Sequence, residues 1–209
     1  MIGDAFYTTV AREASAEFEE KRSVFIGHVR RCDSEEEALS FVKEIKKEYA
    51  DANHNVYGYS INGGVLARYS DDGEPQGTAG MPVLDTIRKS GVDNVCVVVT
   101  RYFGGTLLGA GGLVRAYSHS ASISIEEAGI AKYEPYSQYS LRCGYSEYQR
   151  YSSYFSNINA LVEDTIFDAD VTVIFSVKRR VAESVLEKIR EMSFGRGVPE
   201  FIEERFDYR

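Results

Sequence analysis

The sequence contains no long hydrophobic run, few cysteines and no surplus of basic residues. Its longest apolar stretch, NVCVVVT at 94–100, is far too short to cross a bilayer. The N-terminus has an early acid and no basic-then-apolar ramp, so we expect no signal peptide. The three cysteines are odd in number and widely separated, which is typical of a reducing compartment. These absences predict a cytoplasmic protein that does not contact a membrane.

The charge balance and the histidines limit the kinds of partner. The chain of 209 residues has a formal net charge of −8, whereas a generic nucleic-acid binder needs surplus Lys and Arg to neutralise phosphates. A local basic patch is still compatible with this charge. His28, His54 and His119 lack the spacing of metal ligands, and neither C-x-x-C nor H-E-x-x-H occurs. We therefore expect no metal site built from these residues.

The pattern of apolar residues predicts an α+β fold with two domains, 1–134 and 135–209. In the first domain, strands are expected over 5–11, 23–29, 55–61, 65–70 and 94–100, the last of them buried and central. The segment 16–22 reads as a polar strand or a turn. Helices are expected over 33–49, with a capping box of Ser34 and Glu37, over 81–89, and from the glycine-rich stretch to about Gly129. A proline and polar residues near 132–137 mark the boundary.

The second domain has its own pattern of elements. Strand, helix, two strands, helix and strand follow one another over about seventy residues, in the order βαββαβ. This order is typical of the ferredoxin-like split. We therefore expect a ferredoxin-like C-terminal domain.

The glycine-rich stretch raises the main functional question. Residues 101–121 read RYFGGTLLGAGGLVRAYSHSA, but a dinucleotide fingerprint needs a glycine at Val114, and a P-loop needs a lysine that is missing here. A helix start still presents free backbone N–H groups, which glycines allow an anion to approach. The simpler interpretation is tight packing of strand and helix, and the residues alone favour it. The anion-binding hypothesis involves Arg101, Gly104, Gly105, Gly109, Gly111, Gly112, Arg115 and His119.

An acidic loop precedes the helix expected over 81–89. Asp71, Asp72 and Glu74 could hold Mg²⁺ through oxygen ligands, but Asp-Gly and Glu-Pro are also ordinary turn sequences. The turn interpretation is favoured. Whether this loop faces the glycine-rich stretch does not follow from the sequence.

Two long motifs resemble those of the IMPACT/YigZ family. They are DDGEPQGTAGMPVLDTI at 71–87 and VVVTRYFGGTLLGAGGLVRAY at 97–117, preceded by a His-Asn pair. The order and spacing fit nearly the whole chain. Val56 stands where the family often has a cysteine, which argues against thiol chemistry at that position. Besides the glycines, the motif residues are His54, Asn55, Pro75, Gly77 and Thr78.

The resemblance implies more than the residues alone. The N-terminal domain would be similar to domain IV of elongation factor G and to the N-terminal domain of GHMP kinases, and the C-terminal domain to domain V of that factor. Eukaryotic relatives regulate translation by competing for the activator of a stress-response kinase, and they carry an extra RWD domain. Because the motifs here begin almost at Met1, the kinase role is not carried over.

We therefore expect a translation-associated factor that binds, with weak catalysis or none. Its Gly/Arg groove would contact the ribosome, structured RNA or an acidic protein partner, without a cofactor. The alternative is an enzyme that binds a nucleotide or phosphate ligand in the same groove, with Mg²⁺ at the acidic loop. The oligomeric state does not follow from the sequence.

Overall fold

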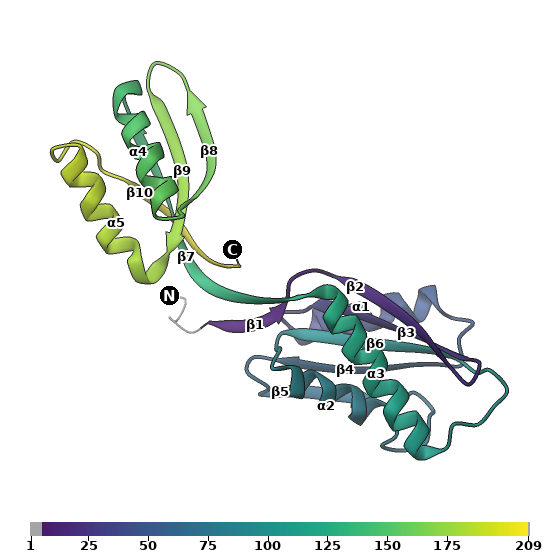
Figure 1. Cartoon of the computed structure of the whole chain (residues 1–209). Coiled ribbons are helices and arrows are strands. Elements are labelled where there is room, and N and C mark those ends of the chain that lie inside the picture. Colours follow the sequence, from purple (N-terminus) through teal and green to yellow (C-terminus); the bar gives the residue numbers. More distant parts are fainter. Residues whose placement is uncertain (1–5, 209) are drawn as a thin grey trace. The chain divides into compact units, whose positions relative to one another are not determined.

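The computed structural model describes residues 6–208, which form two compact units (Figure 1). One unit is Tyr7–Lys132, and the other begins at Tyr133 and includes Phe6. Residues 1–5, with Ala5 of the expected first strand, and Arg209 lie outside the described residues. None of the described helices is long and apolar enough to span a membrane.

The N-terminal unit is built on a five-stranded antiparallel sheet with the order β2-β3-β6-β4-β5. The central strand is β6, as its unbroken run of apolar residues predicted. The segment expected as a polar strand or a turn is strand β2, which ends in a turn at Lys21 and Arg22. The strands are β2 (Ala14–Glu20), β3 (Ser23–Arg31), β4 (His54–Ile61), β5 (Leu66–Ser70) and β6 (Val95–Tyr102).

Three helices cover the two faces of this sheet (Figure 1). Helix α1 (Glu35–Glu48) packs on one face, and α2 (Gly80–Ser90) and α3 (Ala110–Ala128) pack on the other. Side chains alternate along β6, so Val97 faces α2 and α3 while Val98 faces α1. Ser34 caps α1 by accepting from the Glu37 N–H, but the Glu37 carboxylate accepts from the Asp33 N–H rather than from that of Ser34. The expected helices are all present.

The C-terminal unit has the expected ferredoxin-like order βαββαβ, which confirms the α+β class. Strands β10, β7, β9 and β8 lie side by side in its sheet, because β7 pairs with both β10 and β9 and β9 pairs with β8. Helices α4 and α5 pack on it through one apolar core. The elements are β7 (Ile130–Cys143), α4 (Tyr145–Asn157), β8 (Leu161–Phe167), β9 (Val171–Lys178), α5 (Arg179–Met192) and β10 (Glu200–Asp207). Strand β1 (Tyr7–Val10), a segment of the N-terminal unit, also pairs with β7.

The stretch expected as a polar boundary is part of a strand. Residues 132–137 lie within β7, which is unbroken from Ile130 to Cys143 although it contains Pro135. Alternation explains this, because Ala131 and Tyr133 are buried while Ile130 and Lys132 are exposed. The two units divide between Lys132 and Tyr133, inside this strand.

All three cysteines lie in the cores. Cys32 and Cys96 belong to the cluster on the α1 side of the N-terminal sheet, and Cys143 belongs to the C-terminal core. Burial raises the pKa of the Cys32 thiol to about 12 and also raises the pKa of the other two thiols. The cysteines are therefore packing residues, as small hydrophobes usually are.

Candidate functional site

A pocket of about 400 Å³ lies at the end of the N-terminal sheet where β4 begins and β6 ends. The acidic loop and the start of α3 both line it, so these two segments do face each other. Its polar end is formed by Asn53, His54, Glu74 and Arg101. Its other walls are Pro75, Phe103, Leu107, Leu108, Gly109, Ala110 and Leu113.

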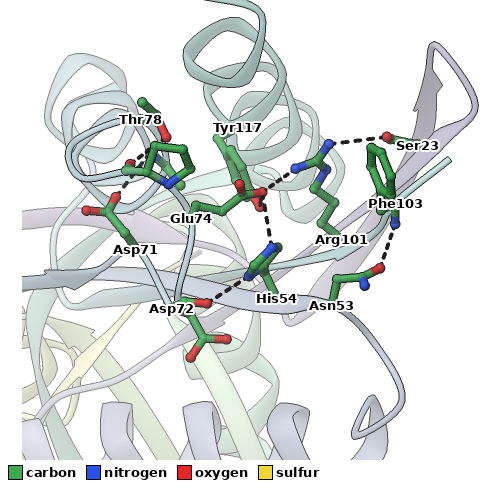
Figure 2. A network of polar contacts seen from close by, with 12 residues as sticks. Ser23, Asn53, His54, Asp71, Asp72, Glu74, Thr78, Arg101, Phe103 and Tyr117 are labelled. Carbon is green, nitrogen blue, oxygen red and sulfur yellow. Dashed lines mark hydrogen bonds and ion pairs between the residues drawn. The ribbon is translucent and has the colours of Figure 1, made fainter. Parts of the chain in front are cut away.

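Glu74 is the centre of the polar end (Figure 2). Arg101 donates to its Oε1 over 2.5 Å, and the Tyr117 hydroxyl donates to the same oxygen over 2.7 Å. The side chains of Glu74 and Arg101 are 4% and 6% exposed, so the ion pair is buried. Burial, together with the neighbouring Glu74 carboxylate, raises the pKa of Tyr117 and keeps its hydroxyl a donor. The network ties the acidic loop to β6 and α3.

His54 approaches Glu74 from the first position of β4. Its Nδ1 lies 2.8 Å from the Asp72 carbonyl oxygen, and its Nε2 lies 3.9 Å from Glu74 Oε1 (Figure 2). A carbonyl oxygen only accepts, so Nδ1 carries the proton and donates. The other ring nitrogen, Nε2, is therefore the one that lies toward Glu74 and the pocket.

The other carboxylates of the acidic loop stabilise the loop and α2. Asp71 accepts from the N–H groups of Gly77, Ala79 and Gly80, over 2.8, 3.1 and 2.8 Å. It thus caps α2, whose N-cap residue makes no side-chain cap bond.

Asp72 accepts from Lys46 Nζ over 2.5 Å and from the Asn55 N–H over 2.6 Å. All three loop carboxylates therefore already have donors from the protein. Among residues 6–208, no group of three His, Cys, Asp or Glu side chains is arranged to hold a metal ion. The geometry fits the turn interpretation of the loop, and it does not fit a Mg²⁺ site.

The glycines of the 101–121 stretch serve different purposes. A Cβ on Gly104 would lie 2.0 Å from the carbonyl carbon and oxygen of Arg22, so close packing requires glycine there. Gly105 and Gly109 have φ of 81° and 72°, which favour glycine for conformational reasons. Gly111 and Gly112 lie in the first turn of α3 and do not line the pocket. Packing and backbone conformation thus account for three of the five, and Gly109 also lines the pocket.

Arg115 and His119 do not lie where the anion-binding hypothesis needs them. Both are exposed on α3, outside the lining of the pocket. The His119 ring instead contacts the edge of Phe18, with centroids 4.7 Å apart. Arg101, expected to supply free charge, is buried and paired with Glu74. Leu113 and Tyr117 point toward the sheet. The polar face of α3 does line a hollow, of about 580 Å³, through His119, Ser122 and Glu126, but it is not the pocket that Arg101 lines.

The family-motif residues divide between the pocket and its support. His54 and Pro75 line the pocket. Asn55 is buried, donating to the Tyr49 carbonyl and accepting from the Thr100 hydroxyl. Gly77 has a φ of 76°, and the Thr78 hydroxyl donates to the Pro75 carbonyl over 2.6 Å.

Several residues of the site were not predicted from the sequence. Tyr117 completes the buried network, and the Asn53 Oδ1 accepts from the Phe103 N–H over 2.7 Å. Leu107 is 82% exposed and Phe103 is 45% exposed at the mouth of the pocket. The pair Leu107-Leu108 could have indicated the apolar wall, because two adjacent leucines are unexpected in a glycine-rich loop that is otherwise polar.

Comparison with known proteins agrees with this architecture. The family model for the Impact N-terminal domain matches residues 21–125, and the Domain of unknown function (DUF1949) matches residues 141–196. IMPACT family member YvyE of Bacillus subtilis (strain 168) is 42% identical over 127 residues, which are 60% of this chain and 58% of that protein. The chain thus spans less than two thirds of YvyE.

Two further matches cover more of the chain. An IMPACT family member of Haemophilus influenzae is 30% identical over 192 residues, which are 89% of this chain and 93% of that protein. A solved structure described as a hypothetical protein superimposes with a TM-score of 0.62 at 28% identity, covering 95% of this chain and 98% of that one. The family model, the long H. influenzae alignment and the shared two-domain architecture show that this chain belongs to the IMPACT family.

Proposed function

We propose that this chain is a translation-associated binding factor whose N-terminal unit contacts ribosomal RNA. Membership of the IMPACT family supports a regulatory role in translation, and the likeness to domains IV and V of elongation factor G supports a ribosomal partner. The contact surface is the end of the sheet that carries Phe103 and the pocket. Binding, rather than catalysis, is the activity proposed.

The main support is an exposed aromatic ring beside unpaired cations. The missing Cβ of Gly104 lets the Arg22 backbone pack against the residue that follows Phe103. Lys21 and Arg22 are exposed in that turn, and neither forms an ion pair with any residue of the described part of the chain. Aromatic rings stack on bases while cations contact phosphates, so this combination suits RNA.

A third unpaired cation lies near the start of α3. Arg115 is exposed one turn into α3, without an ion-pair or hydrogen-bond partner between residues 6 and 208. The acids Glu19 and Glu20 precede the turn in β2, so the surface is local and mixed rather than a broad basic face. This fits a chain whose net charge is −8, because an acidic protein needs a confined site for RNA.

Co-sedimentation with ribosomes across a salt series tests the proposal. The informative variant is Arg22→Ala/Arg115→Ala. Arg101 is left unchanged, because its replacement would leave the buried Glu74 carboxylate without its ion-pair partner. Lys43→Ala/Lys47→Ala is the matched control, since it removes the same charge from exposed positions on α1. We expect binding that weakens with salt, and a salt slope reduced by about 1 per lost phosphate contact in the first variant only.

Two results would overturn this function. One is the absence of co-sedimentation even at low salt. The other is a variant at Arg22 and Arg115 that binds like the control. Competition by naked ribosomal RNA separates contact with RNA from contact with an acidic ribosomal protein, because only the former is displaced.

The pocket itself favours a second candidate, an enzyme or receptor for a free nucleotide. Its volume of about 400 Å³ and its apolar walls with a few polar groups are typical of small-ligand sites. Thermal unfolding with mononucleotides, with and without Mg²⁺, checks this candidate. Stabilisation by a nucleotide together with failure to bind ribosomes would favour it over the RNA-binding role.

A further inference from the structure

Two hydrogen-bond acceptors face each other at the polar end of the pocket. Glu74, paired with Arg101, is a carboxylate and can only accept. The His54 ring donates its Nδ1–H to the Asp72 carbonyl, so in the neutral tautomer Nε2 is a second acceptor. Nε2 and Glu74 Oε1 lie 3.9 Å apart, which is beyond hydrogen-bond distance (Figure 2).

The second oxygen of Glu74 adds to this excess of acceptors. The donors from Arg101 and Tyr117 both reach Oε1. No hydrogen bond from residues 6–208 reaches Oε2, although the side chain is only 4% exposed. An acceptor without a donor gains from one, so this oxygen suits an N–H group of a ligand. The Nε–H of Arg101, in contrast, is a buried donor without a hydrogen-bond partner in the described residues.

Asn53 supplies a hydrogen-bond donor at the same end of the pocket. Its Oδ1 accepts from the Phe103 N–H, which leaves the Nδ2 amide free to donate. The polar end therefore offers acceptors from Glu74 and His54, a donor from Asn53 and, beside them, the buried and unpartnered Nε–H of Arg101. The walls, formed mainly by Phe103, Leu107 and Leu108, are apolar.

We propose that this pocket binds one unpaired guanine base of RNA. This inference rests on the proposed function, because it takes RNA as the ligand of the N-terminal unit. The guanine edge carries two adjacent donors, N1–H and the 2-amino group, beside the acceptor O6. The donors match Glu74 and His54, O6 matches the Asn53 amide, and the flat apolar faces match the walls.

The other bases match this polar end less well. Adenine and cytosine each place an acceptor nitrogen beside their amino group, which would add another acceptor facing Glu74. Uracil has a single N–H between two acceptors. Inosine keeps N1–H and O6 but lacks the 2-amino group, so it isolates that one donor.

Fluorescence anisotropy with labelled RNA hairpins tests the base preference. The hairpins differ only at one unpaired loop position, which is guanosine, inosine, adenosine or uridine, and the full chain is titrated. We expect guanosine to bind tightest, with a discrimination of roughly 5- to 150-fold against adenosine or uridine. Inosine should fall between guanosine and these two.

Three variants test whether the preference for guanosine arises in this pocket. Phe103→Ala removes a partly exposed wall residue and should weaken guanosine binding roughly 5- to 150-fold, the range for loss of one stacked base. Tyr69→Ala is the matched control, because Tyr69 is a comparably exposed aromatic, 42% against 45%, on β5. His54→Phe keeps a ring but removes the acceptor, and it should lower the discrimination between guanosine and adenosine. Circular dichroism checks that each variant is folded.

The outcomes separate this inference from the proposed function. Binding of all four hairpins with equal affinity, or an unchanged preference in Phe103→Ala, overturns the guanine pocket and leaves the RNA-binding role intact. Failure to bind any hairpin or ribosomes overturns the proposed function itself. Binding of guanosine monophosphate as tight as that of the hairpin assigns the pocket to a free nucleotide and overturns the assignment to RNA.

Discussion

Replacing single glycines in the glycine-rich stretch separates packing from backbone conformation. In Gly104→Ala, the new Cβ would lie 2.0 Å from the carbonyl carbon and oxygen of Arg22 and 2.4 Å from the Ser23 nitrogen. These are backbone atoms of the turn between β2 and β3, so no side-chain rotation relieves the clash. Overpacking of this kind typically costs about 1–3 kcal/mol, and we expect the upper part of that range.

Two neighbouring glycines provide the comparison. Gly105→Ala meets no atom within 4 Å but has a φ of 81°, so we expect a cost of about 1–2 kcal/mol. Gly111→Ala lies in the open first turn of α3, where alanine should stabilise by about 0.5–1 kcal/mol. The predicted order of stability is Gly111→Ala, wild type, Gly105→Ala and Gly104→Ala.

Differential scanning calorimetry measures these differences. At about 4 °C per kcal/mol, the transition of the N-terminal unit in Gly104→Ala should lie roughly 10–16 °C below that in Gly111→Ala. The transition of the C-terminal unit serves as an internal control, because no substituted glycine belongs to it. A Gly104→Ala protein as stable as the wild type would refute the packing argument. It would show that the turn between β2 and β3 shifts without a measurable cost in stability.

Three further changes test the supports of the pocket. Glu74→Ala should destabilise the N-terminal unit by about 3–5 kcal/mol in urea denaturation, because it leaves buried Arg101 unpaired, and Glu74→Ala/Arg101→Met should recover part of the loss. A double variant no more stable than the single one would contradict this account. Asp71→Ala should cost about 1–2 kcal/mol through loss of the cap of α2, and an unchanged melting temperature would show that water replaces the cap. Burial lowers the pKa of His28 from 6.5 to about 4, so the unfolded chain binds the extra proton between these values. Stability should be complete above pH 6.5 and fall by up to about 3 kcal/mol as the pH drops to 4, and His28→Gln should flatten this dependence in urea titrations.

The sequence predicted the elements that depend on local patterns. The valine run of β6, the capping residue of α1 and the glycine that ends α2 are each read from residues close together in the chain. The two long motifs likewise identified the family before any contact was known.

The site was predicted only in part, because its contacts join distant segments. Arg101 and Glu74 were both singled out, but nothing in their separate motifs indicated that they neutralise each other across 27 positions. The same limit applies to Tyr117, which could not be distinguished from the other apolar residues of α3. Arg115 and His119 share a helix face, but only the packing of α3 on the sheet shows that this face lies away from the pocket.

The three buried cysteines allow the opening of each unit to be measured by thiol alkylation. Alkylating reagents attack the thiolate, and burial raises the pKa of all three cysteines, so each thiol should react only while its surroundings are open. Cys143 lies in one unit, and Cys32 and Cys96 lie in the other. Alkylation rates followed residue by residue in the mass spectrometer would therefore measure the opening free energy of each half separately in the undivided chain.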